Sequence, residues 1–285
     1  MGRWHWMILL AGLCTFLRGA TTDEQVLVEA LSHPKFWSSV HAAKYLTELQ
    51  LAPDAVEDYL NSRKKCESEP VQRIGIWRVQ ALRCRRPEER TAVLNHLRAI
   101  AFAKDSPSDQ VHAIETLFKL RYRCTEQERA LLEKCSAFDS PLLQIYSSAL
   151  LALQVPGEIS RLTSLYRRYL SKAPYGGVLL YVLQEFPALP DELLSALEES
   201  CRPDENASSR IQVQRILIRH GRLKYSQLKP DDLPASGASL RFLLENAPKS
   251  EACQTMILQL AKSADIESRM LAAYAALKIA CANTR

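Results

Sequence analysis

Histidines are the first candidates for chemistry in this chain, because imidazole serves as a metal ligand and as a general acid or base. After residue 20 they are few and widely spaced: His33, His41, His96, His112 and His220. No His-Glu-x-x-His pattern occurs, and no histidine is directly followed by glutamate. His41 and His112 hold the same position in two of the repeats described below, but about two repeat lengths of chain separate them. We therefore predict no metal site and no cofactor, and we interpret both as partly exposed helix residues.

Cysteines are the second candidates, and seven of them follow Cys14: Cys66, Cys84, Cys124, Cys135, Cys201, Cys253 and Cys281. An odd number at irregular spacing does not indicate a disulfide framework, and no Cys-x-x-Cys pair exists for zinc or redox chemistry. We expect most of these thiols to pack as small half-buried side chains. A single Cys124–Cys135 bridge around one helix is the alternative.

Motifs that would indicate an enzyme are also missing. The sequence contains no Gly-x-Ser-x-Gly, no phosphate-binding P-loop and no Gly-x-Gly-x-x-Gly. Gly176-Gly177 precedes an apolar run and indicates a close approach of two helices rather than a phosphate loop. We predict no catalytic residue and no enzymatic activity.

The charge balance argues against nucleic acid as a partner. The net charge is +5, and the 37 basic residues include Arg3 and Arg18, which leaves 35 against 32 acidic residues after position 20. DNA-binding domains usually carry a stronger basic bias on one face. Most of the arginines fall near predicted helix ends, where they complement the helix dipole without any ligand.

Residues 1–20 are predicted to be an export signal. Arg3 precedes an apolar stretch of eleven residues at positions 7–17, which is too short to span a bilayer, since that takes about 20 residues. Gly19 and Ala20 are small enough for cleavage, although Arg18 fits such a site poorly. A lipid anchor at Cys14 and an uncleaved anchor are the alternatives. We predict an exported protein, periplasmic or secreted if the source is bacterial, with no membrane span.

The elements that must position any binding residues are helices. Leu, Ala, Glu, Arg and Lys dominate, glycine is scarce at nine residues, and alternating β-branched runs are nearly absent. Amphipathic helices are predicted over six ranges: 55–63, 88–102, 126–135, 159–170, 192–199 and 251–261. Thr125 and Glu128 form a capping box, and Ser106-Pro107 and Ser140-Pro141 are typical helix starts.

A second set of helices lies between these ranges and carries pairs of small or apolar residues. The second member of each pair, here called the anchor, falls at positions 43, 76, 114, 149, 178, 213, 240 and 273. The intervals are 33, 38, 35, 29, 35, 27 and 33 residues, the period of stacked helix–turn–helix repeats. Between residues 225 and 237, Pro230 and Pro234 prevent a full first helix, and a bend is expected there.

Residues 265–281 resemble the second helix of a HEAT repeat, with an Asp start, Arg269 and the pair Ala272-Ala273. The same phase recurs at Ala42-Ala43 and at Ala113-Ile114. The resemblance implies an all-α fold for residues 21–285. This fold would be an α-solenoid of about eight irregular HEAT-like repeats wound into a right-handed superhelix.

The residue after each anchor forms one structural row: Lys44, Trp77, Glu115, Leu150, Leu179, Gln214, Arg241 and Tyr274. A helix turns about 100° per residue, so this row is expected to point off the packed face toward the inner surface. Aromatic residues and arginine are favoured in binding hot spots. We hypothesise that Trp77, Arg78, Arg241 and Tyr274 contact a partner.

These features favour an exported scaffold that binds a protein partner through its concave surface without catalysis. One alternative is a HEAT-like enzyme or lyase-type subunit whose groove holds a substrate. A second is an intracellular nucleic-acid binder in which residues 1–20 form a first helix.

Overall fold

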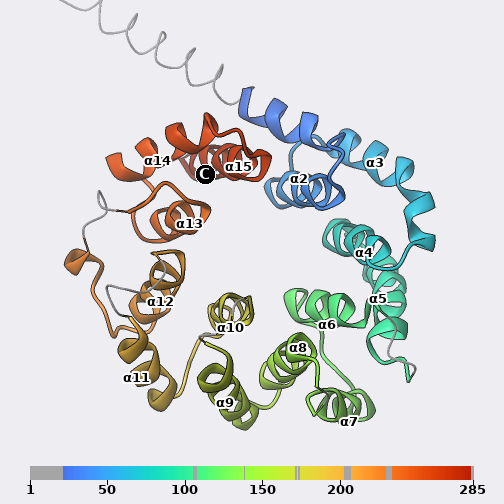
Figure 1. Cartoon of the computed structure of the whole chain (residues 1–285). Coiled ribbons are helices and arrows are strands. Elements are labelled where there is room, and N and C mark those ends of the chain that lie inside the picture. The colour runs from blue at the N-terminus through green and yellow to red at the C-terminus, as the bar shows by residue number, and fades with distance from the viewer. Residues whose placement is uncertain are drawn as a thin grey trace, which may run out of the picture. The chain divides into compact units, whose positions relative to one another are not determined.

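The protein is all-helical in the part of the chain that a computed structural model describes (Figure 1). That part comprises residues 22–104, 108–137, 139–170, 172, 174–201, 207–228 and 233–283. The predicted signal at residues 1–20, with Cys14, lies outside it, as do Ser106-Pro107. The all-helical fold class is confirmed for the described residues.

Helices alternate along the chain between the two predicted sets. The anchor positions lie in α2 (Phe36–Leu49), α4 (Gln72–Arg83), α6 (Gln110–Lys119), α8 (Pro141–Ala152), α10 (Tyr175–Leu183), α12 (Ala207–Arg219), α13 (Gly237–Asn246) and α15 (Ile266–Asn283). Between them lie the first helices: residues 22–30, α3 (Pro53–Ser62), α5 (Pro87–Ala101), α7 (Glu126–Cys135), α9 (Ile159–Tyr169), α11 (Asp191–Ser200) and α14 (Glu251–Ala261). The six predicted first helices agree with these bounds to within two residues.

Local capping explains where several helices begin. The Thr125 side chain accepts a hydrogen bond from the Glu128 backbone N–H, and the Glu128 side chain accepts one from the Thr125 N–H, which completes the predicted capping box of α7. Ser140 accepts from the Leu143 N–H, and Pro141 occupies the first turn of α8. Both predicted helix starts are confirmed.

Among the described residues between α12 and α13, the only helical element is a short 3₁₀ turn, Tyr225–Gln227. Residues 229–232, with Pro230, lie outside the described residues, and the bend expected at residues 225–237 stays a prediction. Two further 3₁₀ turns, Lys64–Ser68 and Pro156–Glu158, occur elsewhere in the described chain.

The chain divides into two compact units. The central unit is Lys65–Pro234, and the terminal unit combines the described residues up to Lys64 with those from Ala235 onward. The boundary at Pro234 falls within the predicted bend.

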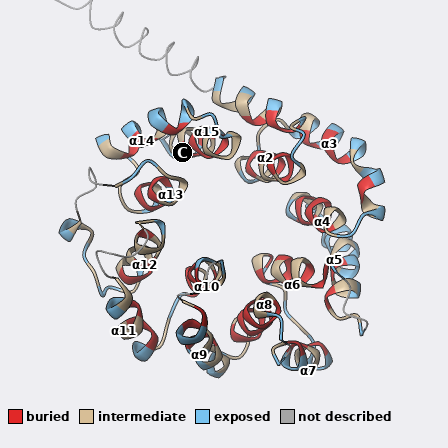
Figure 2. Cartoon of the chain, viewed as in Figure 1, coloured by how far each residue is buried: buried red, intermediate tan, exposed pale blue. Residues whose placement is uncertain are grey.

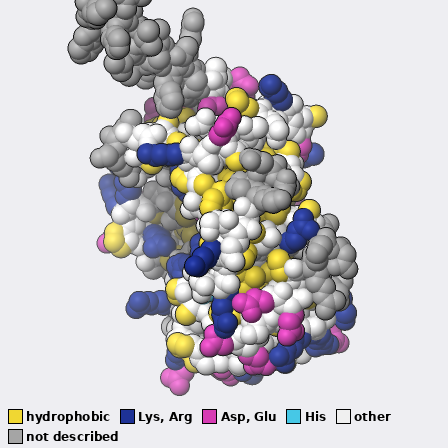
Figure 3. All heavy atoms as spheres, turned by 90° about the vertical axis from the view of Figure 1, so that its left-hand side faces the viewer, with side chains coloured by type: hydrophobic (Ala, Val, Ile, Leu, Met, Phe, Trp, Pro, Cys, Tyr) yellow, Lys and Arg dark blue, Asp and Glu magenta, His cyan; other side chains and the backbone are white. Residues whose placement is uncertain are grey.

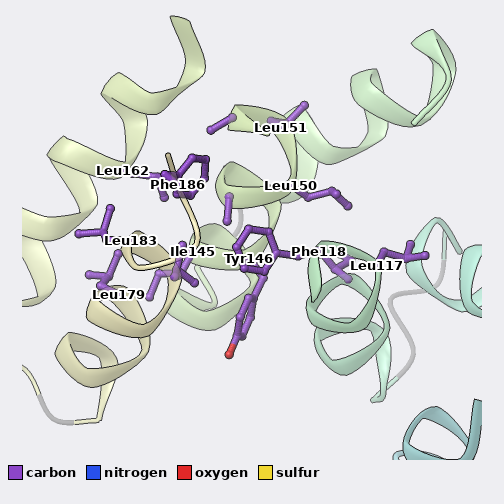
Figure 4. Close-up of a cluster of buried hydrophobic side chains, with 14 of the residues drawn as sticks. Leu117, Phe118, Ile145, Tyr146, Leu150, Leu151, Leu162, Leu179, Leu183 and Phe186 are labelled. Carbon is purple, nitrogen blue, oxygen red and sulfur yellow. The ribbon is translucent and has the colours of Figure 1, made fainter. Parts of the chain in front are cut away.

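The central unit consists of two layers of helices. The second helices α4, α6, α8, α10 and α12 pack in succession, and α5, α7, α9 and α11 pack against them (Figure 1). Buried residues lie on the helix faces that meet within this unit (Figure 2). Phe118 of α6, Tyr146 and Leu150 of α8, and Leu179 of α10 meet in its core (Figure 4).

The anchors occupy buried positions, as expected for contacts between helices. Seven are buried, namely Ala43, Ile76, Ile114, Ala149, Val213, Leu240 and Ala273, and Val178 is half-buried. Their small or compact side chains allow close helix approach, and their burial supplies part of the hydrophobic stabilisation of each pair.

The terminal unit joins helices from both ends of the described chain. α2 packs on α3 and on α15, and α15 packs on α13 and α14. Ser38 of α2 donates a hydrogen bond of 2.7 Å to Glu267 of α15, across 229 residues of sequence. His41 also contacts Glu267, with 2.9 Å between Nδ1 and the carboxylate. The first complete helix after residue 30 therefore packs on the last one.

Cys124 and Cys135 are free thiols, so the alternative Cys124–Cys135 bridge is not formed. Of the seven described cysteines, three are buried and four are half-buried. Burial raises the pKa of the Cys135 and Cys253 thiols, which keeps them in the protonated form that packs as a small apolar side chain.

Gly176 provides a direct test of the predicted close helix approach. A Cβ atom there would lie 2.2 Å from the Leu170 carbonyl oxygen, whereas one at Gly177 would meet nothing within 4 Å. Gly176→Ala should therefore destabilise the protein by about 2 kcal/mol, because backbone must shift. Gly177→Ala, one residue along the same helix, should stabilise it by about 0.5 kcal/mol through better helix propensity. Urea denaturation of both variants measures the difference, and equal midpoints would contradict the packing described.

Candidate functional site

The expectation that Trp77 is exposed for a partner is wrong. Its side chain is only 8% exposed and stacks on His96 of α5, with ring centroids 5.1 Å apart. The Arg73 guanidinium lies 5.8 Å from the Trp77 ring on α4 itself. The position after the anchor of α4 therefore faces the first-helix layer, and Trp77 contributes to packing in the central unit.

Arg78 is also buried, at 5% exposure, and takes part in a polar network across α4 and α6. Its Nε and Nη2 atoms donate to the Thr116 hydroxyl at 3.0 and 2.7 Å, and its Nη2 lies 3.6 Å from the Glu115 carboxylate. Lys119 and His112 contact the same carboxylate. We call Arg78, His112, Glu115, Thr116 and Lys119 the glutamate network.

Glu115 is the centre of this network. Burial alone would raise the pKa of its carboxyl, but hydrogen bonds from His112 and Lys119 and the charges of Lys119 and Arg78 outweigh burial. The pKa of Glu115 therefore lies well below its ordinary value, and the side chain is ionised over the physiological range. The network satisfies a nearly buried carboxylate and links two second helices.

The other two predicted residues, Arg241 and Tyr274, come together in the terminal unit. Arg241 is exposed on α13, and its Nη2 donates to the Tyr45 hydroxyl of α2 at 3.3 Å. The Tyr45 ring stacks on the half-buried Tyr274 ring of α15, with centroids 4.4 Å apart and an interplanar angle of 25°. Lys278, one turn after Tyr274, donates to the Tyr274 hydroxyl at 3.3 Å.

Glu48 of α2 completes this group, because its carboxylate lies near the Tyr274 hydroxyl and helps to raise the pKa of that hydroxyl. We call Tyr45, Glu48, Arg241, Tyr274 and Lys278 the tyrosine cluster. Burial is the main reason that the pKa values of Tyr45 and Tyr274 are raised, and nearby Glu48 raises them further. Both hydroxyls therefore remain protonated and neutral while they accept hydrogen bonds from Arg241 and Lys278.

Sequence reasoning missed Tyr45, Glu48 and Lys278. Lys278 lies four residues after Tyr274, so helical spacing alone would have placed it beside the predicted residue. Tyr45 follows the anchor Ala43 by two residues, and no local pattern indicates that it meets α15.

Other features of the surface are mixed in character. Basic and acidic side chains are interspersed with hydrophobic ones on the face drawn in Figure 3.

Within the described ranges, no three His, Cys, Asp or Glu side chains gather in an arrangement that could hold a metal ion. Among the helices of the described chain, none combines the length and apolar character needed to cross a membrane.

Comparisons with known proteins identify no relative: no family model, no curated protein and no solved structure matches this chain.

The glutamate network generates a pH-dependent prediction. Glu115→Gln leaves Arg78 and Lys119 without their counter-charge and should destabilise the protein by about 3 kcal/mol at neutral pH. Because the folded-state pKa is depressed, the ionised carboxylate stabilises the fold above its ordinary pKa of 4.5. That contribution is lost progressively as the pH falls below 4.5 toward the folded-state value.

Denaturant unfolding at a series of pH values should therefore show that the difference in free energy of unfolding between wild type and Glu115→Gln becomes smaller in acid. Glu133→Gln, which removes an exposed carboxylate on α7, is the matched control and should change little. If the difference in free energy of unfolding stays constant between neutral pH and acid, Glu115 does not stabilise the fold through its charge.

Proposed function

We propose that this chain is an exported binding scaffold of the HEAT-like α-solenoid type. In this proposal its second helices line the concave side of a right-handed superhelix and present side chains to a protein partner, with no catalysis by the chain itself. The alternation of first and second helices up to α12, with seven of the eight anchors buried, supports the architecture.

The tyrosine cluster is the observation that carries the binding proposal. Arg241 and Lys278 are exposed, and both are held by tyrosine hydroxyls on second helices. Arginine and tyrosine in a partly desolvated patch are the residues most often found in interaction hot spots. Trp77 and Arg78 have no part in this proposal, because they are buried.

Arg241→Ala should weaken capture of a partner by the tagged protein purified from its own compartment, with little change in melting temperature. Arg269→Ala is the matched control, because Arg269 is an exposed arginine of α15 outside the tyrosine cluster. Quantitative mass spectrometry of the captured proteins measures the effect. If both variants retain the same proteins in the same amounts as wild type, binding does not use the cluster.

Export is tested separately at the N-terminus. We expect the mature chain to begin near residues 20–22, because the apolar core at positions 7–17 directs translocation. Leu10→Arg interrupts that core and should leave the chain in the cytosol with Met1 in place. Cell fractionation with intact-mass measurement reads both outcomes. Wild-type cytosolic protein that retains Met1 would rule out export, and a lipid-modified chain starting at Cys14 would identify a lipoprotein.

A further inference from the structure

The tyrosine cluster contains two cations that form no ion pair with a described residue. Arg241 donates to the Tyr45 hydroxyl, and Lys278 donates to the Tyr274 hydroxyl and lies 5.4 Å from the centroid of that ring. Neither forms an ion pair with another described residue, and both are exposed. By contrast, the buried Arg78 of the central unit has Glu115 as its counter-charge.

The tyrosines reduce the cost of ordering these two cations. A free arginine or lysine loses about 2 kcal/mol of rotamer entropy when it is immobilised. Here one hydroxyl positions each head group, and the two rings are stacked on each other between α2 and α15. Because raised pKa values keep both hydroxyls neutral, they hold the cations without cancelling their charge.

The acids around the cluster restrict which anion fits. Glu48 belongs to the cluster and is 34% exposed, and Glu267, whose charge acts on Tyr45, is 41% exposed. A continuous polyanion such as nucleic acid or a sulfated glycan would bring closely spaced negative charges against both carboxylates. A single carboxylate side chain of a partner can pair with the cations of the cluster. The uncharged atoms next to it in the partner can stay away from Glu48 and Glu267 or form hydrogen bonds with them.

We propose that the tyrosine cluster binds carboxylate side chains of an acidic polypeptide segment, with Arg241 and Lys278 as its two donors. The guanidinium of Arg241 has N–H groups beyond the one used on Tyr45 and can pair with a carboxylate through two hydrogen bonds. The inference rests on the proposed scaffold function and names the chemistry of its partner.

Fluorescence anisotropy tests this with the full mature chain and a labelled peptide that alternates glutamate and serine. We expect saturable binding that weakens with added salt. Arg241→Ala and Lys278→Ala should each raise the Kd about tenfold, the loss expected for one charge-assisted hydrogen bond. Arg269→Ala and Lys262→Ala, which remove exposed cations of the same unit outside the cluster, should leave the Kd unchanged.

Circular dichroism melts check that each variant is folded. Should Arg241→Ala lower the melting temperature, Lys278→Ala still decides the question, because it leaves the Arg241–Tyr45 bond in place. Absence of binding to the glutamate peptide, or equal Kd values for cluster and control variants, overturns the inference. So does tighter binding of heparin or of a single-stranded oligonucleotide that also depends on Arg241.

The two proposals fail in different ways. If wild type does not bind the glutamate peptide but Arg241→Ala still reduces partner capture, the scaffold function stands and the carboxylate chemistry is wrong. If neither assay responds to Arg241, the cluster is not an interaction site.

Discussion

This structure depends on one constraint: its helices are short, and none of them can bury its apolar face alone. Most of the described helices have 9 to 15 residues, a length at which an isolated helix is marginal in water. Within each unit, helices gain stability by packing on neighbouring helices. Helices at the two ends of such a series lack one neighbour. In the terminal unit, α2 and α15 supply that neighbour to each other.

The local parts of the fold could be predicted because their signals are local. The capping box of Thr125 and Glu128 and the Ser140-Pro141 start depend only on contacts within one turn. The anchors follow from helical periodicity, and burial of Ala43, Ala149 and Ala273 agrees with it. A side chain at Gly176 would clash with the backbone of Leu170, whereas one at Gly177 would meet nothing, and this agrees with the predicted close approach at the glycine pair.

The candidate site was predicted only in part, for two physical reasons. Helix phase predicts which side chains point away from one packed face, but α4 packs on both α5 and α6. All residues from Ile74 to Val79 are buried, so Trp77 lies in packing rather than on an open surface. The second reason is sequence distance. A repeating pattern indicates contacts between neighbouring repeats, so it contains no sign that Tyr45 stacks on Tyr274. Arg241 and Tyr274 were singled out from the sequence as candidates, but Tyr45, the residue that contacts both, was not.

The packing of α2 on α15 also imposes an order on how the chain can fold during synthesis. The central unit, Lys65–Pro234, is continuous in sequence, and its contacts join helices close in the chain. The terminal unit is discontinuous, and Ser38 cannot meet Glu267 until the 229 residues that follow Ser38 have been made. Closing a contact over 229 residues is slow compared with pairing adjacent helices. Until α15 has been synthesised, the face of α2 that meets it has no native neighbour, and such transiently exposed apolar surface favours aggregation.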